Sequence, residues 1–129
     1  MKIISVVGAR PQFVKEAVIQ KELQKYSDIE HIFIHSGQHY DRNMSEIFID
    51  DFELRMPDYY LNVNGLSHAG LTAKIMTRIE KLFKEENPDL ILVYGDTNTT
   101  LAAALTARKM KIKIGHIEAG LRQSPKDMP

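Results

Sequence analysis

The chain has 129 residues, which suits a single domain that buries about two-thirds of its unfolded surface. Its 17 basic and 17 acidic residues cancel, so the charge gives no support to broad nucleic-acid or membrane-surface binding. The absence of cysteine excludes disulfide scaffolds, thiolate zinc sites and cysteine nucleophiles. No apolar run approaches the roughly 20 residues of a membrane span, and residues 1–8 resemble a strand rather than a signal peptide, so we expect a cytoplasmic protein.

The first half of the chain alternates strand and helix patterns. Residues 2–8 form an apolar, β-branched run typical of a buried strand. Pro11 suits the start of a helix, where its missing N–H costs nothing, and the spacing predicts a helix over residues 11–25. Residues 31–36 are predicted to be the second strand. The predicted helix carries an apolar stripe made of Val14, Val18, Ile19 and Leu23.

The alternation continues beyond residue 40. Asp41 or Asn43 can cap a helix that runs to about residue 53, and residues 59–63 fit a short strand. Ser67 can cap a long helix that stops at residues 87–89. The remaining predicted elements are a buried strand over residues 90–94, a helix with an alanine-rich stretch over residues 97–110, and a strand over residues 112–117.

This order of elements predicts an α/β fold, a Rossmann-like parallel sheet sandwiched by helices and joined by right-handed crossovers. We expect residues 1–129 to form one domain. After residue 117 the sequence offers no helix to cover the last strand, although parallel strands are normally covered on both faces. We therefore expect an amino-terminal portion whose partner domain lies elsewhere.

Polar side chains stand beside glycines where the predicted strands stop. The carboxyl ends of parallel strands share one edge, and open α/β sheets bind ligands in the crevice there. Arg10, Asp96 and Glu118 are far apart in the sequence, yet such a sheet would bring them to one rim. The relevant segments are residues 8–10, 37–39, 95–97 and 115–120.

Arg10 lies in a strand-to-helix turn, with Lys15 about one turn further along. Two cations near the amino terminus of a helix would favour an anion site, although both could equally be solvated surface charges. The turn lacks the glycines of the dinucleotide fingerprint, and no P-loop sequence is present.

The two carboxylates each have a second interpretation. Asp96 fits a helix cap, but Thr97 competes for that position and would leave Asp96 pointing into the crevice. Glu118 is costly to bury unless paired, so a structural salt bridge to Arg10 or Arg122 is the alternative to a catalytic role. Two carboxylates on one rim can divide acid and base work.

Other polar residues indicate less. Gln38 and His39 follow the second strand and can hydrogen-bond a ligand, or can form an ordinary polar turn. The five histidines form no metal-binding pattern, so no metal site is expected. No serine lies in the elbow motif of serine hydrolases.

Four segments together carry one pattern, in order and across the whole chain: VGARPQFVK (7–15), SGQHY (36–40), VYGDTN (93–98) and HIEAGLR (116–122). This combination resembles the non-hydrolysing UDP-N-acetylglucosamine 2-epimerase family. The resemblance implies half of a glycosyltransferase-B architecture, in which two Rossmann-like domains face each other across a cleft. The chain is similar to the amino-terminal domain of that family, so we expect the carboxyl-terminal domain that holds most of the nucleotide to lie outside it.

The resemblance also implies a reaction, which inverts C2 of the sugar through loss of UDP to a glycal and its re-addition. Asp96 and Glu118 would be the carboxylates near C2, with Lys15 as a further catalytic residue. Arg10, Gln38, His39 and Arg122 would contact the UDP-sugar. No cofactor or metal is required, and a homodimer serving polysaccharide precursor synthesis is expected.

Three alternatives stay open at this stage. Residues 43–48 and 57–59 are similar to a sister branch that acts on UDP-2,3-diacetamido-2,3-dideoxy-glucuronate. A hydrolysing 2-epimerase would release free N-acetylmannosamine and UDP. A ligand-binding or regulatory domain would bind a UDP-sugar without exchange at C2. Residues 1–129 alone are expected to be inactive.

Overall fold

The computed structural model describes residues 1–8, 10–37, 54–63 and 65–117, with the backbone alone at residues 10 and 11. Five parallel strands form one sheet in the order β3-β2-β1-β4-β5. The strands are β1 (Lys2–Val7), β2 (Glu30–His35), β3 (Tyr59–Tyr60), β4 (Leu90–Tyr94) and β5 (Lys113–Ile117). The helices described are α1 (Arg10–Leu23), α3 (His68–Glu86) and α4 (Asn98–Lys109).

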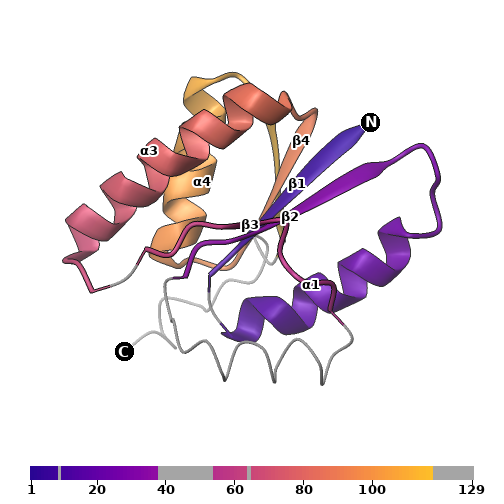
Figure 1. Cartoon of the computed structure of the whole chain (residues 1–129), viewed down its shortest axis with the longest axis horizontal. Coiled ribbons are helices and arrows are strands. Elements are labelled where there is room, and N and C mark those ends of the chain that lie inside the picture. Colours follow the sequence, from indigo (N-terminus) through magenta and orange to yellow (C-terminus); the bar gives the residue numbers. More distant parts are fainter. Residues whose placement is uncertain (9, 38–53, 64, 118–129) are drawn as a thin grey trace, which may run out of the picture.

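The helices lie on both faces of the sheet. Figure 1 shows α3 and α4 together on one face and α1 on the other. The sheet is buried between two hydrophobic clusters, one under α3 and α4 and one under α1. The predicted α/β sandwich with a parallel sheet is therefore confirmed.

The cluster beneath α3 and α4 is apolar throughout. Helix α3 begins at its cap Ser67, as predicted, and buries four apolar residues on one face. In α4, three alanines are fully buried against the sheet, because small side chains let the helix axis approach it closely. The buried apolar residues of the two helices are Leu71, Ile75, Ile79, Phe83, Ala102, Ala103 and Ala107.

Helix α1 differs from its prediction. The helix is present, but its apolar stripe is not the buried face, because Val14 is 40% exposed and Val18 is 65% exposed. The side chains that point toward the sheet are largely polar and recur every four residues. They are buried because groups of the sheet satisfy them with hydrogen bonds. The buried face consists of Gln12, Phe13, Glu16, Ala17 and Gln20.

Most predicted boundaries differ from the observed ones by one or two residues. The strand predicted over residues 59–63 is shorter, because Asn62 has a left-handed backbone conformation (φ 56°) that interrupts it. Leu61 and Val63 still donate backbone hydrogen bonds to the end of β2. The helix predicted to run from residue 41 or 43 to about residue 53 lies outside the described residues.

Candidate active site

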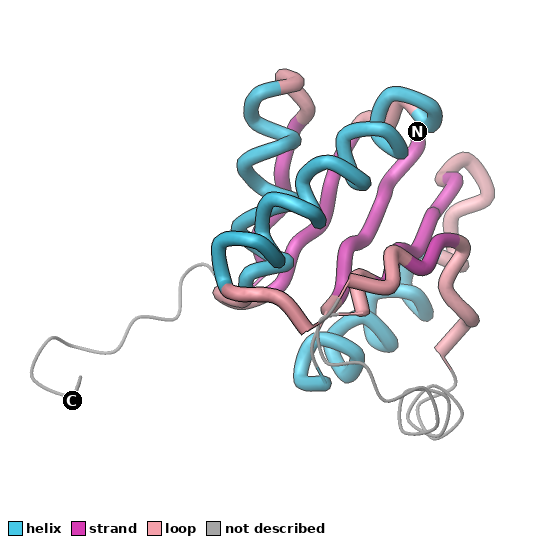
Figure 2. Tube along the Cα trace, turned by 60° about the vertical axis from the view of Figure 1, so that its left-hand side comes forward, coloured by secondary structure: helices cyan, strands magenta, loops and turns pink. Residues whose placement is uncertain are grey.

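Strands β1 and β4 lie side by side at the centre of the sheet, and the chain leaves them in opposite directions. After β1 it enters α1 on one face, and after β4 it enters α4 on the other face (Figure 2). This divergence is the topological switch point, where open α/β sheets bind their ligands. Gly8 and Gly95 follow the two strands directly, so the turn that leads to Arg10 and the turn that contains Asp96 begin at this point.

The end of β1 is packed too tightly for any side chain at Gly8. A Cβ built there would lie 2.6 Å from the Ser36 Oγ and 2.9 Å from the Thr99 Cβ, and closer still to the Thr99 Oγ1. The two hydroxyls hydrogen-bond each other at 2.8 Å. Glycine is therefore required by space, and the first turns after β1 and β2 are held against the start of α4.

Asp96 is not the cap of α4. Thr97 takes that position, and its side chain accepts the backbone N–H of Thr100. The preceding Gly95 has a φ of +65°, which turns the chain sharply after β4. The Asp96 side chain is exposed at this turn, so the interpretation that frees it from capping is confirmed.

Strand β5 ends beside the Asp96 turn. Ile117 pairs with Tyr94 in the sheet register, and the backbone N–H of Gly95 donates to the Ile117 carbonyl at 3.3 Å. The His116 ring adds a 2.6 Å hydrogen bond to the Gly95 carbonyl. Glu118 follows Ile117 in the sequence but lies outside the described residues, so its place near Asp96 stays a prediction.

The other predicted site residues are described only in part. Arg10 is the first residue of α1, but its side chain is not described. Lys15 lies on the same helix and is half-buried. Gln38, His39 and Arg122 lie outside the described residues. The structure thus places the backbone of Arg10 and the turn with Asp96 at the same edge of the sheet, and the roles of all seven residues stay predictions.

Gln12 belongs to the predicted motif, yet the sequence assigned it no role. Its side chain is 3% exposed and connects the ends of the two central strands. The Oε1 atom accepts the N–H of Gly8, and the Nε2 atom donates to the Tyr94 carbonyl, each at 2.8 Å. Pattern analysis cannot show that Gln12 is buried beside partners so distant in the sequence. The recurrence of polar residues every four positions in α1, at Gln12, Glu16 and Gln20, is the one signal of a polar buried face.

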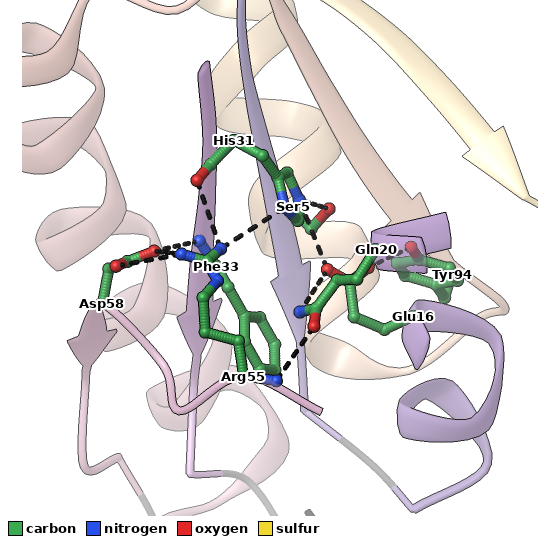
Figure 3. A network of polar contacts seen from close by, with 8 residues as sticks. All are labelled: Ser5, Glu16, Gln20, His31, Phe33, Arg55, Asp58 and Tyr94. Atoms are coloured by element: carbon green, nitrogen blue, oxygen red, sulfur yellow. Dashed lines mark hydrogen bonds and ion pairs between the residues drawn. The ribbon is translucent and has the colours of Figure 1, made fainter. Parts of the chain in front are cut away.

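A network of polar side chains lies on the α1 face of the sheet, with Ser5 of β1 and Tyr94 of β4 among its members. Figure 3 shows Glu16 of α1, whose carboxyl oxygens accept hydrogen bonds from Tyr94 and Gln20. The His31 Nε2 lies 2.7 Å from the Ser5 Oγ and 3.3 Å from a Glu16 oxygen. Glu16 has no exposed surface, so α1 is fixed to the sheet by polar contacts rather than by apolar packing alone.

Burial decides the charge state of this network. It raises the pKa of the Glu16 carboxyl to about 7, although the hydrogen bonds from Tyr94 and Gln20 lower it. Burial, with the nearby Arg55 charge, lowers the pKa of His31 to about 4. Between these two values Glu16 and His31 are both neutral, so their 3.3 Å contact is not an ion pair. The pKa of Tyr94 is raised by burial and by Glu16, so its hydroxyl stays protonated.

The network continues to the surface on the side of β3. The Arg55 guanidinium donates to the His31 carbonyl at 3.2 Å and contacts the Asp58 carboxylate at 3.0 Å. Asp58 in turn accepts the backbone N–H of Phe33 at 2.8 Å. These contacts tie the segment before β3 to β2, as the dashed lines in Figure 3 show.

His35, the last residue of β2, holds the turn that leads to the predicted ligand contacts. Its ring lies between Phe13 and Tyr60, with ring centroids 4.9 and 4.6 Å away. The Nδ1 atom accepts the N–H of Gly37 at 2.8 Å. Burial lowers the pKa of His35 to about 4, so the ring is neutral near pH 7 and can accept this bond.

Two hollows are lined by described residues and lie away from this edge. One of about 700 Å³ opens at the amino ends of the strands, where Met1, Asp89 and Lys113 meet. The second, about 240 Å³, lies beside His31 and Arg55. Neither is at the carboxyl edge, where this type of sheet binds ligands.

Within the described part of the chain, no three histidine or acidic side chains gather closely enough to hold a metal ion. None of the helices described there is both long and apolar enough to span a membrane.

Strand order, switch point and glycine turns define a Rossmann-like domain. The model of the family described as UDP-N-acetylglucosamine 2-epimerase matches residues 21–129. Since that match covers most of the chain, the chain belongs to the UDP-N-acetylglucosamine 2-epimerase family. The predicted family and fold class are thereby confirmed.

Individual relatives agree with this membership. A Methanococcus maripaludis protein named UDP-N-acetylglucosamine 2-epimerase homolog is 50% identical over the whole chain, which covers 36% of that protein. A Pseudomonas aeruginosa UDP-2,3-diacetamido-2,3-dideoxy-D-glucuronate 2-epimerase is 46% identical with the same coverage. The crystal structure of Methanocaldococcus jannaschii UDP-GlcNAc 2-epimerase in complex with UDP-GlcNAc and UDP matches 99% of the chain and 35% of that protein, with a TM-score of 0.91 and 42% identity. The chain spans about a third of the length of the curated relatives it matches.

Proposed function

We propose that the chain is part of a UDP-N-acetylglucosamine 2-epimerase, an isomerase that interconverts UDP-GlcNAc and UDP-ManNAc. The observation that carries the proposal is the exposed Asp96, released from capping by Thr97, at the switch point of a family member. Relatives named for this activity in Methanococcus maripaludis and Methanocaldococcus jannaschii are 45% and 43% identical to the chain.

The reaction needs carboxylates because the hydrogen on C2 of the sugar is not acidic in the substrate. Breaking the C1–O bond releases UDP with the bonding electron pair and leaves positive charge on the ring. A carboxylate then takes the C2 proton, and the electrons of the C–H bond form the C1–C2 double bond of a glycal. Re-addition of UDP to C1, with a proton delivered to the opposite face of C2, gives the epimer. The elements of UDP and one proton leave and return, so no redox cofactor is required.

We assign the two proton-transfer roles to Asp96 and Glu118, and the neutralisation of the departing diphosphate to Arg10 and Lys15. Gln38, His39 and Arg122 complete the proposed UDP-sugar contacts. The sheet register, which pairs Ile117 with Tyr94, supports the assignment of the two carboxylates. Asp96 lies two residues after Tyr94, and Glu118 lies one residue after Ile117. A helix amino terminus beside Arg10 supports the phosphate assignment.

A second substrate has a specific observation in its favour. The Pseudomonas aeruginosa relative, named for UDP-2,3-diacetamido-2,3-dideoxy-D-glucuronate, is as similar to the chain as the relatives named for UDP-GlcNAc. The same elimination and re-addition would apply, since the two sugars share the 2-acetamido group. The carboxylate on C5 would add one negative charge for the protein to bind.

The setting of the site is part of the same proposal. The chain would form the amino-terminal domain of a glycosyltransferase-B architecture, with the UDP-sugar bound between it and a second Rossmann-like domain. A homodimer in the cytoplasm, serving polysaccharide precursor synthesis, follows from the family resemblance.

Product analysis tests the proposal. A protein of the relatives' length that contains this chain is incubated with UDP-GlcNAc and, separately, with the diacetamido uronate. Formation of UDP-ManNAc with the same mass as the substrate is expected. Conversion of the uronate alone would favour the second candidate, release of free N-acetylmannosamine would indicate a hydrolysing enzyme, and binding without conversion would contradict an epimerase.

A further inference from the structure

We propose that Gln12 is a positioning residue of the epimerase reaction, which fixes the loop of Asp96 relative to the loop of Arg10. The inference rests on the proposed function, because it concerns the geometry of that site. Within the described residues, the side-chain hydrogen bonds of Gln12 go to the ends of β1 and β4 and to the start of α4. It acts through the main chain on both sides of the switch point.

The Gln12 side chain can bind two backbone groups at once. A primary amide has an acceptor and a donor at opposite corners of one rigid plane. The Gln12 Oε1 accepts the Gly8 N–H at the end of β1, and its Nε2 donates to the Tyr94 carbonyl at the end of β4. Both bonds are 2.8 Å long, and the side chain is 3% exposed, so water does not compete for them.

The two backbone partners of Gln12 lie just before the proposed site residues Arg10 and Asp96. Gly8 lies two residues before Arg10, and Tyr94 lies two residues before Asp96. The Nε2 of Gln12 is also 3.1 Å from the Oγ1 of Thr97, the cap of α4. One side chain therefore holds the residues on both sides of the Gly95–Asp96 turn, in addition to the turn before Arg10.

Gln20 allows a positioning role of Gln12 to be distinguished from the burial of an amide alone. Gln20 is on the same helix, two turns later, and is buried to the same degree, with 4% exposed. Its Nε2 donates to Glu16 and its Oε1 accepts the backbone N–H of Arg55, each at 3.1 Å. Within the described residues, the Gln20 side chain makes these two hydrogen bonds and none to the turns that follow β1 and β4. It is a matched control within the chain.

The test compares Gln12→Met with Gln20→Met in a protein of the relatives' length. Methionine keeps the unbranched shape and removes both hydrogen bonds. A displacement of about 1 Å between reacting groups can lower a rate by about 100-fold, so we expect kcat for Gln12→Met to fall by about 10- to 100-fold. The Gln20→Met variant should keep kcat within about twofold. Both variants should lower Tm, since each leaves buried polar groups unpaired, so kcat is the readout that separates them.

A third variant grades the effect. Gln12→Glu can still accept from Gly8 but donates to Tyr94 only while its carboxyl is protonated, so its kcat should fall as the pH rises and that carboxyl ionises. If Gln12→Met does not fold, the comparison of Gln12→Glu with Gln20→Glu decides by the same criterion.

The outcomes separate the two levels of the proposal. Wild-type activity with a selective loss of kcat at position 12 supports the positioning role. Wild-type activity with kcat unchanged at position 12, or with equal losses at positions 12 and 20, overturns it and leaves the epimerase assignment intact. Absence of epimerisation by the wild-type protein would overturn the proposed function itself.

Discussion

The side chain of Thr97 accepts the backbone N–H of Thr100 and thereby caps α4. This relationship decides between the two interpretations of Asp96, because a helix has one N-cap position. The carboxylate next to the cap stays exposed at the carboxyl edge of the sheet, beside the end of β5. A structural residue and a candidate catalytic residue are therefore neighbours in the sequence with separate tasks.

Replacing Thr97 with alanine should destabilise the protein by about 1 kcal/mol, because it removes the cap acceptor. Thr97→Ser keeps the hydroxyl and should restore most of this loss. The measurement is the Tm of both variants by circular dichroism. A Tm decrease for Asp96→Ala as large as that for Thr97→Ala would contradict the assignment of the cap.

Replacing Gly8 with alanine should destabilise the protein by about 1–3 kcal/mol, as expected for overpacking. The added Cβ would lie 2.6 Å from the Ser36 Oγ and against Thr99, so the end of β1 must move. Gly70→Ala in α3 is the contrasting change and should destabilise less, since its Cβ would lie 3.1 Å from the Ser67 Oγ and 3.6 Å from the Leu66 Cβ. Equal Tm values for Gly8→Ala and the wild type would refute the close packing.

Glu16 predicts a dependence of stability on pH with a definite sign. Its pKa is raised from 4.5 to about 7 in the folded protein, so the folded state binds the proton more tightly than the unfolded state. This contribution is complete below about pH 4.5 and is lost as the pH rises to about 7, which amounts to roughly 3 kcal/mol. Glu16→Gln has no such titration, so its stability relative to the wild type should improve as the pH rises from 5 to 8.

The control for this comparison is Glu22→Gln on the exposed side of α1. Among the described residues the Glu22 side chain contacts the exposed Lys25 at 3.0 Å, so its replacement should change stability little at any pH. The shift of His35 is common to all three proteins and cancels in the differences. A pH-independent difference between Glu16→Gln and the wild type would show that Glu16 is not a buried neutral carboxyl near pH 5.

Residues 1–129 alone should not convert any UDP-sugar. The chain corresponds to about a third of its relatives, and the proposed cleft needs a second wall to hold the nucleotide. The measurement is product formation by the purified chain, after circular dichroism has shown that it is folded. Epimerisation by this chain at any detectable rate would place the complete site within it.

The sequence predicted those features that depend on local patterns. The β-branched runs, the Ser67 cap and the alanine-rich stretch each specify an element through short-range chemistry, and the structure contains them. The competition between Asp96 and Thr97 was also visible, because capping depends on neighbouring residues only. The resolution of that competition needed the observed hydrogen bond to Thr100.

The polar face of α1 could not be predicted in this way. Apolar periodicity favoured the stripe with Val14 and Val18 as the packing face, but both residues are exposed. Gln12 and Glu16 can be buried because Tyr94 on β4 hydrogen-bonds to both of them. Tyr94 lies some 80 residues later in the sequence. A pattern within one helix carries no information on such partners, whereas a folded sheet brings them to within hydrogen-bonding distance.

The most direct test of the account is deuterium incorporation at C2 of the UDP-sugar in heavy water, measured for the wild type and for Asp96→Asn. The asparagine keeps the size of the side chain and removes its capacity to accept the C2 proton. We predict that the wild type incorporates deuterium during epimerisation, and that Asp96→Asn binds the UDP-sugar with an unchanged Tm but exchanges at least about 100-fold more slowly, in line with the loss of a general base. Exchange at a near-normal rate by Asp96→Asn would contradict the catalytic role of the carboxylate at the switch point.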